Sequence, residues 1–86
     1  MATKLTLTEV KVQFPGAWES EIAGLDPEDI MDLLGDMAAG ESEYWVHNGT
    51  LYGRSWWTAL GWHYGEWDGT SWFCPNAGEE VCPWGE

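Results

Sequence analysis

The amino-acid sequence predicts an α+β fold: an antiparallel sheet of about four to five strands, built from hairpins, with one amphipathic helix packed on one face. Three observations lead to this prediction. An apolar stripe of helical period follows a capping aspartate, the turn sequences Asn48-Gly49 and Asp68-Gly69 separate aromatic segments, and an alternating segment lies near the N-terminus. The 86 residues are expected to form a single domain, residues 1–86, with the element order β-α-β-β-β-β.

Residues Lys4–Phe14 are expected to form the first strand, because apolar side chains alternate with polar ones along this segment. The parity of the alternation changes between Leu7 and Val10, which predicts a β-bulge. Pro15-Gly16 is expected to end the strand. The following segment, Ala17–Gly24, has no clear periodicity and is left unassigned.

The predicted helix begins after Asp26 and ends at Gly40. Asp26 is a favourable N-cap, Pro27 suits the first helical position, and Gly40 suits the C-terminal end. Four apolar residues at helical spacing are expected to face the core: Ile30, Leu33, Leu34 and Met37. Four acidic residues are expected to project from the opposite face: Glu28, Asp29, Asp32 and Asp36.

The two turn sequences predict two hairpins with two-residue loops. In the first hairpin, the expected cross-strand partners are His47 with Thr50, Val46 with Leu51 and Trp45 with Tyr52. In the second, they are Trp67 with Thr70 and Gly65 with Trp72. Both faces of the sheet then carry large aromatic side chains, although the chain offers one clear helix.

One sheet face is therefore expected to pack on the helix. The other is expected to carry Trp45, Tyr52, Trp56, Trp67 and Trp72. An exposed aromatic patch of this kind usually marks an interaction site. Alternatively, Trp18, Trp84 and the C-terminal tail fold back over this face as a second small core.

The charge is strongly one-sided, with a formal net charge of −12 and three basic residues, Lys4, Lys11 and Arg54. Nine of the 15 acidic residues lie between Glu19 and Glu43, where no lysine or arginine interrupts them. This charge argues against direct binding to nucleic acid or to an anionic membrane, and favours a basic partner. The aromatic content of 15% argues against disorder.

No segment has the composition of a membrane span or a signal peptide, so a cytoplasmic location is expected, in the host cell if a phage encodes the chain. Cys74 and Cys82 could pair across the intervening loop, although a reducing cytosol favours free thiols. With His47 and His63 they do not reproduce a zinc-site spacing. No catalytic triad or phosphate-binding loop is present, so neither a metal, nor a cofactor, nor an enzymatic activity is expected.

This profile of small size, extreme acidity and clustered carboxylates resembles the small inhibitors that phages direct against host defence or DNA-processing enzymes. These include anti-CRISPR proteins, anti-restriction proteins and uracil-DNA glycosylase inhibitors. The resemblance implies a protein-binding inhibitor, monomeric or a small homo-oligomer, whose carboxylates act as a DNA mimic in a basic channel. The expected contact residues are Glu28, Asp29, Asp32, Asp36, Glu41 and Glu43, with Trp45 and Trp56 as apolar anchors.

Two alternatives come from other functional classes. The tryptophan-rich strands also suit a carbohydrate- or ligand-binding module, because flat indole rings stack on sugars. The aromatic face also suits a small structural or assembly subunit of a phage particle, which would use it for self-association.

Overall fold

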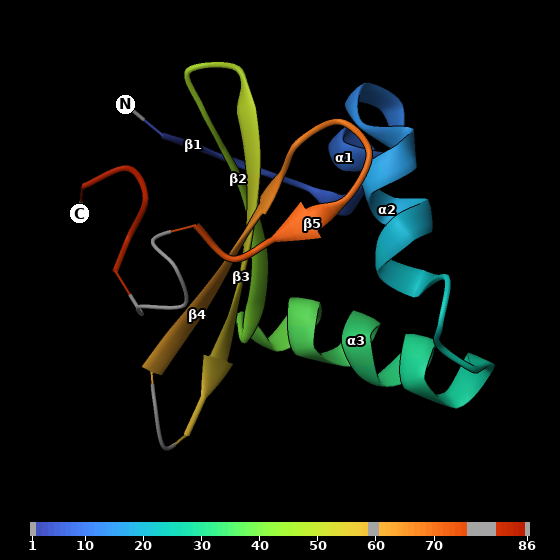
Figure 1. Ribbon diagram of the computed structural model, residues 1–86. Coiled ribbons are helices and arrows are strands. Elements are labelled where there is room, and N and C mark those ends of the chain that lie inside the picture. The colour runs from blue at the N-terminus through green and yellow to red at the C-terminus, as the bar shows by residue number, and fades with distance from the viewer. Residues whose placement is uncertain (1, 59–60, 76–80, 86) are drawn as a thin grey trace.

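Five antiparallel strands form one sheet, and each strand pairs with its neighbours in the order β1-β2-β3-β4-β5. The structure, a computed structural model, describes residues 2–58, 61–75 and 81–85. Its elements are β1 (Thr3–Leu5), α1 (Leu7–Gln13), α2 (Pro15–Ile22), α3 (Pro27–Ala39), β2 (Ser42–His47), β3 (Thr50–Trp57), β4 (Gly61–Trp67) and β5 (Trp72–Phe73). The predicted α+β fold with an antiparallel sheet is confirmed, but three helices instead of one separate the first two strands (Figure 1).

The predicted strand Lys4–Phe14 is wrong beyond its first residues, because α1 begins at Leu7. A capping box starts this helix: the Thr6 hydroxyl accepts the Glu9 N–H at 3.1 Å, and the Glu9 carboxylate accepts the Thr6 N–H at 2.9 Å. Val10 is fully buried. The change of parity after Leu7 is therefore the helical period and not a bulge.

The Pro15-Gly16 pair starts α2 instead of ending a strand, since Pro15 occupies the first helical position. Trp18 is buried in the core, and the Lys11 Nζ lies 5.4 Å from the centre of its ring. A Cβ on Gly16 would lie 3.4 Å from the Trp67 ring, so the glycine lets the helix approach the sheet closely.

The predicted helix between Asp26 and Gly40 is confirmed as α3. The Asp26 carboxylate accepts the Asp29 N–H at 2.9 Å, and Gly40 adopts a left-handed φ of 80° at the C-cap. Leu33 and Met37 pack against the core, but no residue of α3 is fully buried. In Figure 1 the N-terminal half of α3 extends away from the sheet.

The register of the first hairpin is confirmed at all three expected pairs. Asn48 and Gly49 both have positive φ, of 52° and 79°, as a type I′ turn requires. The register of the second hairpin is wrong, because Trp67 pairs with Trp72 and the loop contains four residues, Asp68–Ser71. The Asp68 Oδ1 accepts the backbone N–H groups of Thr70 and Ser71 at 2.7 Å each, and this side-chain turn replaces the tighter one.

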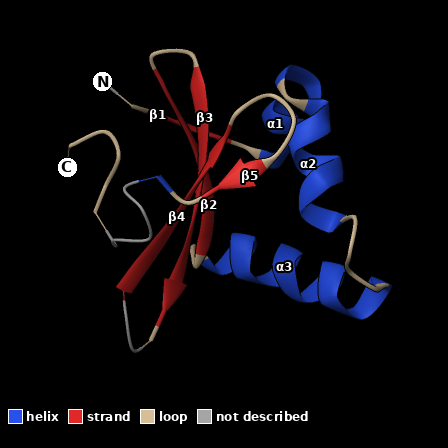
Figure 2. Ribbon diagram, viewed as in Figure 1, coloured by secondary structure: helices blue, strands red, loops and turns tan. Residues whose placement is uncertain are grey.

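The pairing of β3 with β4, Gly53 with Gly65 and Tyr52 with Glu66, places Trp67 and Trp72 on the sheet face that packs against the helices, and not with Trp45 and Tyr52 as predicted. The helix side of the sheet contributes Leu5, Tyr44 and Leu51 to the core, where they meet the buried side chains of α1 and α2. Figure 2 shows the helices on this side and the C-terminal segment on the other. Of the helices described, none has the length and apolar composition required to cross a membrane.

Candidate acidic interaction surface

The acidic face of α3 is open to solvent along its whole length. All four of its predicted contact residues are exposed: Glu28, Asp29, Asp32 and Asp36. Glu41, just beyond the C-cap, is also exposed. None of the ion pairs in the described part of the chain includes an acid of α3.

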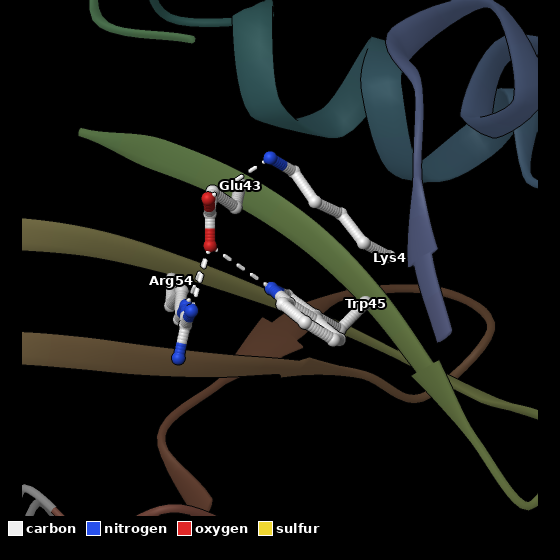
Figure 3. Close-up of polar contacts among 4 residues, drawn as sticks. All are labelled: Lys4, Glu43, Trp45 and Arg54. Atoms are coloured by element: carbon white, nitrogen blue, oxygen red, sulfur yellow. Dashed lines mark hydrogen bonds and ion pairs between the residues drawn. The ribbon is translucent and has the colours of Figure 1, made fainter. Parts of the chain in front are cut away.

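Glu43, a further predicted contact residue, lies on the opposite face of the sheet in a polar network (Figure 3). Its Oε1 accepts Arg54 Nη2 at 2.7 Å, Arg54 Nε at 2.9 Å and the Trp45 indole N–H at 3.1 Å. Its Oε2 lies 3.0 Å from Lys4 Nζ. With Lys11 lying over Trp18, each lysine and arginine side chain has a partner other than the acids of α3.

The electrostatics of Glu43 show a structural role. Burial on its own would raise the pKa of this carboxyl, but the hydrogen bonds from Arg54, Lys4 and Trp45 outweigh it and hold the pKa below its ordinary value. The Glu43 side chain is 12% exposed and that of Arg54 14%. The network therefore fixes β1, β2 and β3 together on the outer side of the sheet.

Trp84 covers the outer aromatic face, as one of the two alternatives anticipated. Its ring stacks on Trp45 at 5.5 Å and meets Tyr52 and Tyr64 at 5.5 and 5.6 Å. Trp18, which the same alternative placed here, instead lies in the core on the helix side. Trp45 thus lies beneath Trp84 and is not an open anchor.

Trp56 is the predicted anchor that remains open, with 49% of its surface exposed. Its ring meets Trp62 edge to face at 5.4 Å. Its backbone N–H donates to the Glu41 carbonyl at 2.7 Å. Trp56 therefore lies beside the residue that directly follows the C-cap of α3. The structure therefore places Glu41 and Trp56 beside the C-terminal end of α3, on the sheet face that also carries Glu43 and Trp45.

A hollow of about 260 Å³ lies on the helix side of the sheet, and the sequence did not predict it. Its walls include Glu21 from α2, Leu33 from α3, Tyr44 from β2, His63 from β4 and Trp72 from β5. Burial, and then the charge of Glu21, raise the pKa of the Tyr44 phenol. Because six elements contribute, β3 among them through Gly53 and Ser55, no local sequence pattern could have indicated this site.

In the described ranges 2–58, 61–75 and 81–85, no group of three His, Cys, Asp or Glu side chains is arranged to hold a metal ion. Cys74 and Cys82 are free thiols. Residues 76–80 of the loop between them lie outside the described residues.

Comparison of the chain with protein-family models, with curated proteins and with solved structures finds no match. The surface chemistry of the protein is therefore what indicates its function.

Proposed function

We propose that the protein binds the basic channel of a nucleic-acid-binding enzyme or defence complex and inhibits it by presenting α3 as a DNA mimic. One observation carries this proposal. The acids of α3 are exposed without an ion-pair partner in the described part of the chain, while Lys4, Lys11 and Arg54 are engaged elsewhere. Most exposed helices mix charges through i,i+4 pairs, and α3 does not.

The dimensions of α3 support this mechanism. Its 13 residues span about 20 Å at a rise of about 1.5 Å per residue. That length corresponds to about six nucleotides of one DNA strand, at about 3.4 Å each. Successive acids Asp29, Asp32 and Asp36 are spaced by about 4.5 and 6 Å along the axis, somewhat wider than the phosphates of one DNA strand but on the same length scale.

The open side chain of Trp56 supplies the apolar part of this surface. Long-range attraction between opposite charges accelerates association, whereas a desolvated aromatic anchor slows dissociation. Trp56 and Glu41 lie beside the end of α3, so charge and anchor can contact one partner. Glu43 and Trp45 are engaged internally and are left out of the proposed contact set.

The test uses the tagged protein as bait in nuclease-treated bacterial lysate at low and high salt. The expected result is capture of a nucleic-acid-binding protein that salt and added DNA displace. The triple variant Asp29→Asn, Asp32→Asn, Asp36→Asn should lose this partner. A matched variant, Gln13→Lys with Glu19→Lys, changes the net charge by the same amount on α1 and α2 and should keep it.

Equal loss of binding in the two variants would attribute the interaction to overall charge and would contradict a site on α3. Recovery of cell-wall material that salt does not displace would favour the carbohydrate-binding alternative. Capture of the chain by itself alone would favour the assembly-subunit alternative.

A further inference from the structure

The hollow between α2, α3 and the sheet has the Glu21 carboxylate in its wall, and Arg54, which also lines the hollow, pairs with Glu43 instead. Glu21 makes none of the hydrogen bonds or ion pairs found among the described residues, and its side chain reaches solvent at the mouth of the hollow. Burial of the carboxyl group raises its pKa. A carboxylate that is partly desolvated and unpaired gains free energy when a cation binds beside it.

Leu33 connects the hollow to the acidic residues of α3. It lines the hollow from α3, and the residues four before and three after it are its neighbours on the helix surface, at the border between the apolar stripe and the acidic face. Those residues are Asp29 and Asp36, both exposed. Neither aspartate lines the hollow, but both lie beside the residue of α3 that does.

The far wall is a flat aromatic surface. The Trp72 ring lies across two glycines paired between β3 and β4, at 3.6 Å from the position of a Cβ on Gly53 and 3.5 Å from one on Gly65. Its indole N–H donates to the Ala17 carbonyl at 3.0 Å, which fixes the ring in place. A planar cation can stack on such a ring while it pairs with a carboxylate.

We propose that this hollow binds a guanidinium group, and that its occupant is an arginine side chain of the protein that the acidic face of α3 contacts. This inference deepens the proposed function and depends on it for the identity of the partner, but not for the chemistry of the hollow. Leu33 contacts the methylene stem, Trp72 the guanidinium plane, and Glu21 its N–H groups. A guanidinium fits better than an ammonium because it is planar and less strongly hydrated.

The first experiment needs no partner protein. N-acetyl-arginine methylamide is titrated into the protein while the NMR signals of the Trp72 indole N–H and the Glu21 carboxyl are followed. The isosteric, uncharged N-acetyl-citrulline methylamide is the ligand control. We expect saturable shifts at both groups with the arginine compound and none with the citrulline compound.

Glu21→Gln tests the carboxylate, and Glu19→Gln is its matched control, because it removes the same charge from an exposed side chain of the same helix two residues away. We expect Glu21→Gln to weaken binding of the arginine compound about tenfold, as loss of a charge-assisted hydrogen bond does. Glu19→Gln should change it less than twofold. Equal effects of the two variants, or no saturable shift in the unmodified protein, would overturn the proposal whatever the lysate experiment finds.

A second titration separates a protein side chain from a free guanidinium compound. The probe is a seven-residue peptide with a central arginine between lysines, and the same peptide with central citrulline is its control. We expect the arginine peptide to bind more tightly than the methylamide, and Asp29→Asn with Asp36→Asn to remove the difference. Equal affinities of peptide and methylamide would assign the hollow to a free guanidinium compound and overturn the assignment to a partner's arginine.

Discussion

Glu43 accepts hydrogen bonds or ion pairs from two of the three cations of the protein and from one indole, all within 3.1 Å. Glu43→Gln keeps the shape of the side chain and removes the charge. Since the 14%-exposed Arg54 then loses its carboxylate partner, we expect the free energy of unfolding to fall by about 1–3 kcal/mol. Urea unfolding measures this change.

The matched control for this prediction is Glu41→Gln, which removes the same charge from an exposed side chain two residues earlier. It should change the free energy of unfolding by less than about 0.5 kcal/mol. If the two variants were equally stable, the network in Figure 3 would contribute nothing to the fold.

Asp68 gives a prediction about pH. Backbone N–H groups of Ser71 and Thr70 and the Thr70 hydroxyl stabilise the carboxylate and lower its pKa from 3.8 to about 2. Because the folded pKa lies below the unfolded one, the stabilisation is complete above about pH 4 and is lost as the pH falls towards 2.

Asp68→Asn should therefore remove part of the decrease in stability between pH 4 and pH 2. Urea unfolding of both proteins at several pH values in this interval measures it. Parallel curves for the two proteins would show that the loop 68–71 opens before the carboxyl titrates.

At the scale of the elements, local sequence signals predicted some parts correctly and failed at others for a physical reason. The caps of α3 and the Asn48-Gly49 turn are each contained in a few residues, and both were predictable. The segment after Leu5 carries β-branched residues that suit a strand, and the capping box of Thr6 and Glu9 is the signal that decides for a helix. Asp68-Gly69 failed because the Asp68 side chain closes a longer loop.

The helix α3 has no fully buried residue, so its caps matter more than they do in a core helix. Asp26→Ala removes the acceptor for the Asp29 N–H, at a cost of about 1 kcal/mol. We expect the amide hydrogens of α3 to exchange about fivefold faster, while those of β3 change less. Hydrogen exchange measured by NMR tests this, and uniform acceleration in both elements would contradict a locally unstable α3.

At the scale of the whole molecule, net charge dominates. The protein measures 34 × 31 × 21 Å, and the Debye length falls from about 30 Å at 0.01 M salt to about 3 Å at 1 M. At low salt the acids of α3 therefore repel those elsewhere on the surface. We expect the urea midpoint to rise as sodium chloride increases from 0.01 to 0.5 M, because screening relieves this repulsion.

The ion pairs of the Glu43 network are attractive, so screening by salt would weaken them and lower the midpoint. Because these side chains are largely shielded from solvent, this effect is small. A midpoint that fell with salt would show that attractive pairs outweigh repulsion. Potassium chloride serves as a control for effects specific to the sodium ion.

The acidic surface could be predicted from the sequence because all its charges lie in one continuous segment, Glu19–Glu43. The hollow could not, because Glu21, Tyr44 and Trp72 meet only after three helices and the sheet have packed. The same limit applies to Trp84, whose partners Trp45 and Tyr52 lie more than thirty residues away in the chain.

The pairing of β1 with β2 has a consequence for the order of folding. Thr3 and Val46 are about forty residues apart, whereas β2 and β3 meet through a two-residue turn. Closing the long loop costs entropy, and the contacts that offset this cost form only after the three helices have packed. We therefore expect β1 to dock late. Leu5→Ala is then expected mainly to accelerate unfolding, while Gly49→Ala slows refolding, and stopped-flow measurements in urea distinguish the two effects. The N-terminal strand thus closes a structure whose hairpins form first.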